Sequence, residues 1–526
     1  MGIVYDRWQT NAKFVRNNLM QTYSCLHAVY RRIRCASLVL LSISLCSCVV
    51  GPDYVRPCAT VPIKFKEASK NWRVAKPNDN YDRGQWWKIF HDPQLNKLEA
   101  QLNCSNQTVA TAAANYRQAS DLVDEARASY FPTLIASASI TRQKSAAIVS
   151  SSGTSGGTVT PGSASAGTTG TVGAAGPKPV TNNSFILNAS WEPDIWGSVR
   201  RTVEASVAGA EASDALLVLT RLMAQASLAQ FYFELRTADK DRQLLNDTVA
   251  NYKEALTLTK NQYASGVAGQ ADIVQAQTQL ETAQAQAINY KINRAVYEHA
   301  IAVLIGLPPS LFSIAYNPLS RSAPLIPVEI PTTALERRPD VAQAERLMAQ
   351  ANANIGVAIA AYYPNLTLSA SGTAAGKGSI AHWLAAPIYG WAVGPQLAET
   401  LFDGGLRNAT TAAARAVYDS SVASYRQVVL AAIQDVEDNL ATLRILKEET
   451  VALDKAAASA RLALKLVTNQ YKSGTVPYSS VITAQTTAYT AEKNAADTRG
   501  LQMTSAVGLI RALGGNWNVR CIFNDA

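Results

Sequence analysis

The segment that most resembles a catalytic motif lies in low-complexity sequence. Gly153-Thr154-Ser155-Gly156-Gly157 matches G-x-S-x-G, the nucleophile elbow that exposes a reactive serine at a strand-to-helix turn. That chemistry needs a buried strand before the serine, a helix after it, and histidine and acidic partners. Here the match falls in a Ser-, Gly- and Thr-rich stretch between Ala146 and Pro177. The Ser- and Gly-rich composition of this stretch produces such a match by chance. The sequence therefore predicts no enzyme.

Histidines and cysteines form no pattern of metal ligands. Three of the four histidines, His91, His299 and His382, stand far apart, so surface or packing roles are the default interpretation. Beyond the predicted leader the cysteines are too scattered for a disulfide framework. A bridge between Cys58 and Cys104 stays open as an alternative. We expect no metal and no cofactor.

The net charge of +9 is unevenly distributed. Six of the 48 Lys and Arg and one of the 39 Asp and Glu lie in residues 1–47, which leaves +4 for the remainder. The remainder contains no basic run of the kind that binds nucleic acid. The sequence therefore predicts no nucleic-acid partner.

The N-terminus has the pattern of a secretory signal peptide. Three arginines, at positions 31, 32 and 34, precede a short apolar run, Leu38–Leu45. A basic segment, a short apolar core and a small-residue cleavage site direct export, and the core is too short to span a membrane. We expect residues 1–47 to be the leader. Met20 is an alternative start, which would make residues 1–19 an extension.

Leu45-Cys46-Ser47-Cys48 resembles a bacterial lipobox, in which the mature protein begins at a diacylated cysteine. The resemblance implies a covalent lipid, palmitate included, on Cys48. Cys46 replaces the usual small residue, and a cleaved signal without a lipid is the alternative. Val49 does not resemble the aspartate that often retains lipoproteins at the inner membrane, so we expect a lipid-anchored protein of the outer membrane.

The chain contains two copies of one unit. LTKNQYASG, ending at Gly266, recurs as LVTNQYKSG, ending at Gly474. ASYFPTL, ending at Leu134, recurs as AAYYPNL, ending at Leu366, with a larger offset because the first copy carries the Ser- and Gly-rich insert. Self-similarity of this kind indicates a repeat architecture.

Long helices dominate each copy. No proline occurs from Asp194 to Leu307 or from Gln396 to Val476, and strong helix formers fill both stretches. A helix from Val207 to Tyr263 would be about 85 Å long at roughly 1.5 Å per residue. Apolar residues follow a 3-4 spacing typical of a coiled-coil seam: Val422, Tyr425, Val429, Ala432, Val436, Leu440 and Leu443.

Each copy also has two runs of alternating apolar and small polar residues, which indicate strands. The runs are Leu134–Thr141, Phe185–Trp191, Leu366–Ser371 and Trp391–Leu397. Strands of a transmembrane barrel alternate in this way, and so do half-buried strands of a soluble sheet. Pro132 and Pro364 lie where helix must become strand, because proline cannot continue a helix. Trp196, Phe402 and Gly404 mark the return to helix.

Four strands are too few to close a barrel. An open edge cannot sit in lipid, since its N–H and C=O groups would lack partners. If these strands enter the membrane, several chains must share one barrel, and three chains would supply twelve strands. The insert would then be an outer loop.

At this point the chain resembles the outer-membrane factor family, the TolC- and OprM-like channels, and most closely its NodT-type lipoprotein branch. The resemblance covers nearly the whole mature chain. Its markers are Val50-Gly51-Pro52-Asp53-Tyr54, Trp86-Trp87 with Phe90–Leu95, Arg337-Arg338-Pro339-Asp340, Ala353-Asn354-Ile355-Gly356, Phe402–Gly405 and Ala512–Trp517.

The resemblance implies a homotrimer with a shared twelve-stranded barrel in the outer membrane and a long periplasmic helical barrel. It also implies efflux without catalysis: the channel docks on a periplasmic adaptor and an inner-membrane pump and passes drugs or other solutes outward. The exit duct of a protein-secretion system is an alternative, and so is a periplasmic coiled-coil scaffold that forms no channel.

Six residues are expected at the periplasmic helix tips, where family members carry a gate: Tyr263, Asp272, Tyr471, Val476, Ser480 and Thr483. By resemblance, Tyr471 is kept and Asp272 falls on an acidic latch position, although it also reads as an ordinary helix-start residue. The latch arginine is replaced by Val476. Ser480 and Thr483 replace two aspartates that form rings in the pore, so we expect weak cation selectivity.

The boundaries expected from these patterns are as follows. Residues 1–47 form the leader and 48–84 a lipidated N-terminal segment; 85–305 and 335–515 are the two repeats; 306–334 is a linker and 516–526 a tail.

Overall fold

The structure is a computed structural model that describes residues 49–58, 65–67, 85–144, 179–319, 323–324, 338–385 and 387–515. The leader, Cys48, the Ser- and Gly-rich insert, Arg337 and the tail lie outside the described residues.

The chain divides into two compact units that cut across the two repeats. One unit consists of residues up to Gly51, Glu125–Thr202 and Gly356–Thr410. The other consists of Pro52–Asp124, Val203–Ile355 and the chain from Thr411 onward. Each unit therefore draws on both copies of the repeat.

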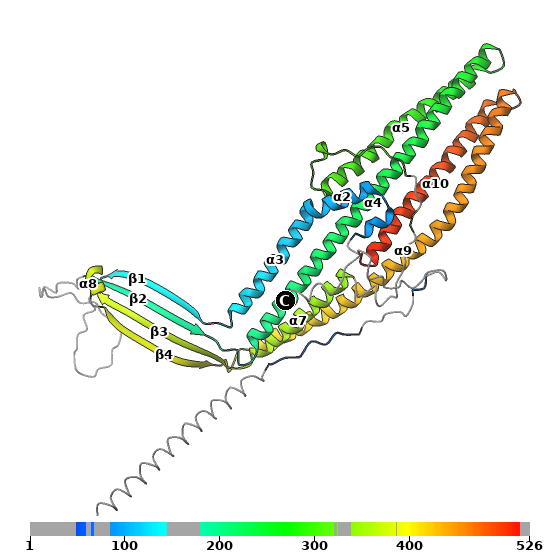
Figure 1. The fold of residues 1–526 in the computed structure, drawn as a ribbon. Helices are drawn as coiled ribbons and strands as arrows, with labels where there is room; N and C mark the ends of the chain where they lie inside the picture. The colour runs from blue at the N-terminus through cyan, green and yellow to red at the C-terminus, as the bar shows by residue number, and fades with distance from the viewer. Residues whose placement is uncertain are drawn as a thin grey trace, which may run out of the picture. The chain divides into compact units, whose positions relative to one another are not determined.

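The first unit is built around one antiparallel sheet (Figure 1). Its strands follow the chain in the order β1 (Thr133–Gln143), β2 (Val180–Trp191), β3 (Asn365–Lys377) and β4 (Ile388–Ala398). A short helix, α8 (Ile380–Ala385), lies between β3 and β4. All four strands predicted from alternation are present.

The second unit is dominated by two helical hairpins, drawn in green and in orange to red in Figure 1. The first hairpin is α4 (Ser198–Ala264) and α5 (Gln270–Leu304); the second is α9 (Leu406–Lys472) and α10 (Tyr478–Ala512). α4 and α9 have 67 residues each, and α5 and α10 have 35 each. At roughly 1.5 Å per residue the longer pair reach about 100 Å. The equal lengths are what a duplicated unit produces.

Shorter elements complete the second unit and lead into the first. They are η1 (Trp86–Phe90), α2 (Pro93–Ser105), α3 (Gln107–Ala128), η2 (Pro309–Leu311) and α7 (Pro339–Ala360). Asp92 caps α2, because its carboxylate accepts the amide N–H groups of Gln94 and Leu95.

The core of the second unit lies where α2, α4, α5, α9 and α10 meet. Its fully buried side chains include Leu95, Leu102, Leu228, Tyr232, Leu235, Ile301, Ile305 and Leu509. On α9 the predicted seam is buried, from Tyr425 and Val429 to Leu440. Among the described residues α4 alone has a stretch long and apolar enough to cross a membrane, and 44% of that stretch is buried.

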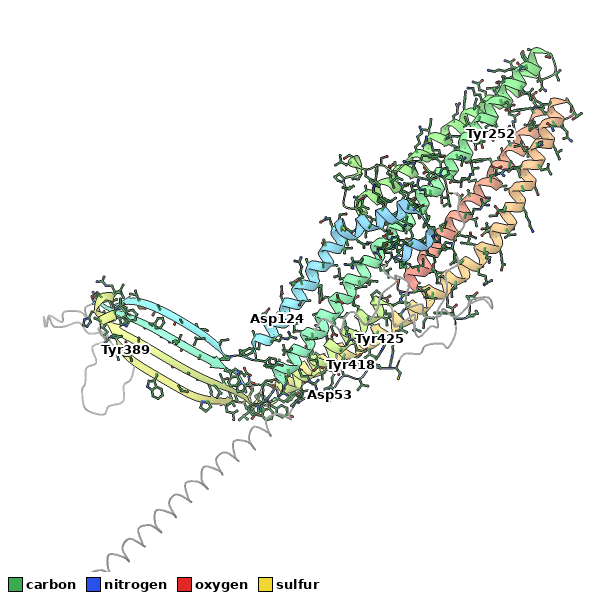
Figure 2. The ribbon with its side chains drawn as sticks, viewed as in Figure 1. Asp53, Asp124, Tyr252, Tyr389, Tyr418 and Tyr425 are labelled. Carbon is green, nitrogen blue, oxygen red and sulfur yellow. The ribbon has the colours of Figure 1, made fainter. Side chains whose placement is uncertain are left out.

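A strap formed by Pro52–Cys58 and Phe65–Glu67 runs along the helices of the second unit. Arg56 donates to the hydroxyl of Tyr425 on α9, at 3.0 Å, and pairs with Glu345 on α7. Tyr425 is labelled in Figure 2. Farther along, the carboxylate of Glu437 accepts the backbone N–H groups of Lys66 and Glu67. Polar contacts therefore fix a segment that has no regular secondary structure.

Candidate functional site

The sheet has one continuous apolar face. In an antiparallel pair, directly opposed residues point to the same side, and the register aligns the apolar positions of all four strands. These residues are Leu134, Ala136, Ala138 and Ile140 on β1; Phe185, Leu187, Ala189 and Trp191 on β2; Leu366, Leu368 and Ala370 on β3; and Tyr389, Trp391, Val393 and Leu397 on β4. Trp391 is 83% exposed and Tyr389 is 79% exposed; Tyr389 is labelled on the sheet in Figure 2.

The opposite face is mostly small and polar. It carries Ser137 and Ser139, Ser184 and Asn188, Ser369 and Ser371, and Gln396. The hydroxyls of Ser139 and Ser184 are hydrogen-bonded across β1 and β2 at 2.8 Å. A sheet with one apolar and one polar face suits a wall between lipid and water.

Both edges of the sheet are open. Within the described residues, β1 pairs only with β2, and β4 pairs only with β3. Eleven-residue strands leave a full row of backbone N–H and C=O groups at each edge. Such edges require further strands before the sheet can enter a membrane.

The predicted junction residues lie between helix and strand. Pro132 immediately precedes β1 and Pro364 immediately precedes β3. Trp196 comes just before α4; its indole N–H donates to the carbonyl of Pro364, and its ring stacks on Tyr363 at 4.8 Å. Phe402 and Gly404 lie between β4 and α9, and Phe402 is 88% exposed.

Sequence reasoning assigned no capping role to the two aspartates that start the long helices, although Asp403 lies in the predicted junction Phe402–Gly405. Asp194 accepts the amide N–H groups of Val199 and Arg200, and the Arg200 side chain pairs with the same carboxylate. Asp403 does the same for Arg407 in the second copy, and Arg407 lowers the pKa of the Asp403 carboxyl. The signal was present in the sequence, because an aspartate precedes each helix.

The hairpin tips are joined within one chain by the side chains of α4 and α9. The Tyr471 hydroxyl donates to the hydroxyl of Thr259 at 3.2 Å, and the Gln262 amide donates to the Tyr471 carbonyl at 3.3 Å. Burial raises the pKa of the Tyr471 hydroxyl. Thr259 and Gln262 were not singled out from the sequence, since they lie far from Tyr471 along the chain.

Below this link lies an apolar cluster shared by both hairpins. It includes Tyr252 (labelled in Figure 2), Leu256, Leu280, Tyr471, Tyr478, Val481 and Ile482, with Val476 packed against it. Val476 therefore lies in an apolar setting, where a latch arginine would need a partner. Burial raises the pKa of the Tyr478 hydroxyl to about 12.

The other predicted tip residues have local roles in the structure. Asp272 caps α5, because its carboxylate accepts the backbone N–H of Gly269 at 3.1 Å. Tyr263 is 47% exposed. Ser480 lies in the first turn of α10, and the exposed Thr483 donates to the carbonyl of Ser479. A latch role for Asp272 stays a prediction.

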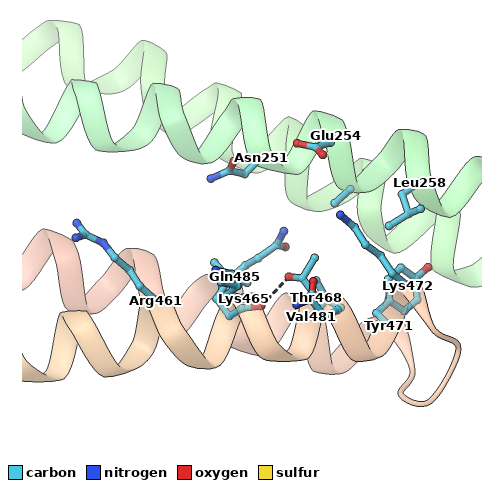
Figure 3. Close-up of a pocket in the computed structure, with 13 residues that line it drawn as sticks. Asn251, Glu254, Leu258, Arg461, Lys465, Thr468, Tyr471, Lys472, Val481 and Gln485 are labelled. Atoms are coloured by element: carbon cyan, nitrogen blue, oxygen red, sulfur yellow. Dashed lines mark hydrogen bonds between the residues drawn. The ribbon is translucent and has the colours of Figure 1, made fainter.

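Between α4 and α9, near the tips, runs an open groove of about 320 Å³ (Figure 3). From α9 it receives Arg461, Lys465 and Lys472, and from α4 it receives Asn251, Glu254 and Leu258. Arg461 is ion-paired with Glu492, and the two lysines outnumber Glu254, so the groove is basic.

No cluster of potential metal ligands occurs among the residues that the structure describes. Cys58 and Cys104 are both free and exposed, so the alternative of a bridge between them is not realised.

A sequence profile described as "Outer membrane efflux protein" matches residues 98–307 and 330–515. The chain belongs to this family. The toluene efflux pump outer membrane protein TtgC of Pseudomonas putida is 28% identical over 487 residues, which span 91% of this chain and 95% of TtgC. The probable outer membrane lipoprotein SilC of Salmonella typhimurium is 26% identical over 91% of this chain and 99% of its own.

Among solved structures, the outer-membrane channel OprN has 28% identity and a TM-score of 0.75, with 89% of this chain and 99% of that chain covered. The predicted fold class is confirmed: a mainly α chain of two repeats with a four-stranded membrane sheet, the fold of the trimeric outer-membrane factor channels. As a member of the family the chain is an efflux channel of the outer membrane and has no catalytic role.

Proposed function

We propose that three copies of this chain form the outer-membrane exit duct of a tripartite efflux pump. The open four-stranded sheet is the observation that carries the proposal. Joining β1 of one copy to β4 of the next, three times over, pairs every edge and closes twelve strands. The apolar face then meets lipid and the serine-rich face lines the water-filled pore.

The remaining partners follow from the family and from the tips. The toluene efflux pump protein TtgC is aligned along nearly its whole length, which supports passage of small solutes from an adaptor and an inner-membrane pump. The free hairpin tips and their basic groove supply the surface on which an adaptor docks. Small-solute efflux is favoured over protein secretion.

A lipid on Cys48 belongs to the same proposal. SilC, similar over nearly its whole length, is named as a lipoprotein. The first described residues after Cys48 lie at the strand-to-helix junction, where the Val50 amide donates to the Trp196 carbonyl at 3.1 Å. A lipid two residues earlier would enter the leaflet beside that junction.

The gate is proposed to close through apolar packing and hydrogen bonds. Val476 packs against the apolar cluster that both hairpins share near their tips, and Tyr471 is hydrogen-bonded to Thr259. With Ser480 and Thr483 in place of acidic rings, the pore mouth has little fixed negative charge there, so cation selectivity is weak.

The test is reconstitution of the purified mature protein in planar bilayers, with single-channel currents and reversal potentials at neutral pH. A detergent-stable trimer with discrete conductance steps and weak cation selectivity is expected. Strong cation selectivity that disappears when Ser480 is changed would contradict the gate proposal. A trimer that stays silent even as the Tyr471→Phe variant would overturn the channel proposal, because loss of the tip link should admit current.

A further inference from the structure

Two helices from different hairpins approach unusually closely near the middle of the second unit. On Gly500 of α10, a Cβ atom would lie 2.2 Å from the Thr237 hydroxyl oxygen of α4. Only a residue without a side chain permits this approach. Roughly one helical turn away on each helix stand two carboxylic acids, Asp241 on α4 and Asp497 on α10.

Asp241 is buried in this contact. It is 6% exposed, and its Oδ1 atom has no hydrogen-bond partner. α4 and α10 run in opposite directions past the contact of Thr237 with Gly500, which sets Asp241 beside Asp497, and the charge of Asp497 acts on Asp241. Two ionised carboxylates side by side repel each other, and burial adds to the cost of ionising Asp241, so the packed helices favour a proton on Asp241.

The surroundings supply one cation for the two acids. Lys493, one turn before Asp497 on α10, is ion-paired with Asp497 and acts on Asp241 through its charge. The phenols of Tyr290 on α5 and Tyr489 on α10 complete the titratable groups facing the pair. With Asp241 protonated the charges of Lys493 and Asp497 balance; with Asp241 ionised a buried negative charge remains.

We propose that Asp241 and Asp497 share a proton that holds α4 against α10, so that the packing of the two hairpins tightens in acid and loosens toward neutral pH. The effect of pH on helix packing does not depend on the proposed channel function. Only its consequence for the opening of the gate rests on that function. We call Asp241, Asp497 and Lys493 the proton site.

The direction of the pH effect on helix packing follows from the pKa of Asp241 in the packed and in the separated helices. Burial, and then the charge of Asp497, raise the pKa of Asp241 to about 7 while the helices are packed. In separated, hydrated helices the pKa returns to its ordinary value near 3.8. The packed arrangement binds the extra proton between these values. Its stability is therefore full below about pH 4 and is lost progressively up to about pH 7.

The other repeat has no equivalent site. By the offset that aligns the two tip sequences, Asp241 corresponds to the exposed Glu449 and Asp497 corresponds to Asn289. Gly500 corresponds to Ile292, whose side chain is 59% exposed. Each chain thus carries one proton site.

Hydrogen–deuterium exchange on the detergent-solubilised trimer at pH 5.5 and 7.5, corrected for intrinsic exchange rates, tests the proposal. In the wild type, we expect protection of α4 around Asp241 and of α10 around Asp497 to fall about tenfold at the higher pH. Asp241→Asn should remove this dependence. The exposed Asp247 on the same helix provides the control, and Asp247→Asn should leave the dependence intact.

Asp497→Asn gives a second variant at a more exposed position, in which the dependence should weaken, because the charge of Asp497 no longer raises the pKa of Asp241 and that of Lys493 still lowers it. Equal protection at both pH values in the wild type, or a dependence that survives both Asp241→Asn and Asp497→Asn, overturns the proposal. Because exchange is measured without current, a protein with a working proton site and no conductance would refute the channel function alone. If the trimer conducts and its open probability is the same at both pH values, the proton site does not regulate the gate.

Discussion

Tyr263 and Tyr471 occupy equivalent positions in the two repeats and have opposite environments. Tyr263 is 47% exposed, whereas Tyr471 is 5% exposed and is hydrogen-bonded to Thr259. Duplication produced two similar turns, and packing between hairpins of the same chain buried only one of the tyrosines. The pair therefore separates the contribution of the turn from that of the inter-hairpin link.

Removing the Tyr471 hydroxyl should loosen the tip. Tyr471→Phe deletes one hydrogen bond, which is worth about 1 kcal/mol, so the open-to-closed ratio should rise about fivefold in single-channel records. Tyr263→Phe is the matched control and should leave the ratio unchanged. Equal effects of the two variants would show that the Thr259 link plays no part in closure.

Glu99 on α2 is a buried acid without a partner. Its side chain is fully buried, and neither carboxylate oxygen has a hydrogen-bond partner. Burial raises the pKa of Glu99 well above its ordinary value. A raised pKa means that the native state holds the proton more tightly, so the contribution to stability is full below the ordinary pKa and is lost as pH rises through the native one.

Glu99→Gln should therefore raise the melting temperature at pH 8 and reduce its fall between pH 5 and pH 8. Asp241 supplies part of the same slope, so some dependence remains. Thermal scans of the purified trimer at a fixed rate measure this. Glu125→Gln, at an exposed position on α3, is the control; a slope equally reduced by that variant would reject the assignment to Glu99.

At the scale of elements, the start of the described chain is held against the end of α7. Gly51 has a φ of +106°, and a Cβ on it would lie 2.6 Å from the Cα of Gly356. Arg201 donates to the carbonyls of Val50 and Gly51 from α4. Two sequence markers far apart in the chain, around Gly51 and Gly356, thus explain each other by direct contact.

Gly51→Ala should weaken this contact by both backbone strain and overlap. The left-handed conformation alone costs about 1–2 kcal/mol for a residue with a Cβ, and the overlap adds to it. We expect a lower yield of trimer in the outer membrane, measured by unheated gel electrophoresis. Gly394→Ala on β4, where a Cβ meets nothing within 4 Å, should assemble normally; a normal yield for Gly51→Ala would refute the argument.

At the scale of the whole molecule, the sheet is incomplete in one chain and the trimer is what completes it. Side chains on both faces are exposed in the single chain, so burial within the protomer does not distinguish the lipid face from the pore face. The alternation of residue types and the strand register do distinguish the two faces. Two neighbouring residues of β4, which point to opposite faces, allow the faces to be compared by mutation.

Val393→Arg and Ala392→Arg place the same charge on opposite faces of β4. On the lipid face an arginine costs about 2–4 kcal/mol near the midplane, whereas pore-facing changes alter selectivity. We expect Val393→Arg to reduce assembly into the membrane and Ala392→Arg to assemble and shift selectivity toward anions. Reconstitution yield and reversal potentials give the two readouts. A normal yield for Val393→Arg would place the apolar face away from lipid.

Much of the architecture was determined by the sequence alone, because it depends on periodicity. Alternation gave the four strands, the 3-4 spacing gave the buried seam of α9, and prolines gave the strand starts at Pro132 and Pro364. The short helix α8 was not identified, because it has only six residues and too few turns to display a period.

The tertiary structure decided everything that depends on contacts between distant segments. Thr259 meets Tyr471, Gly51 meets Gly356, and Asp241 meets Asp497, each pair separated by more than 200 residues. No local pattern encodes such a meeting, because it follows from how long helices from two repeats align. The sequence by itself therefore determined what kind of channel this protein forms, and the fold decided which of its distant residues come into contact.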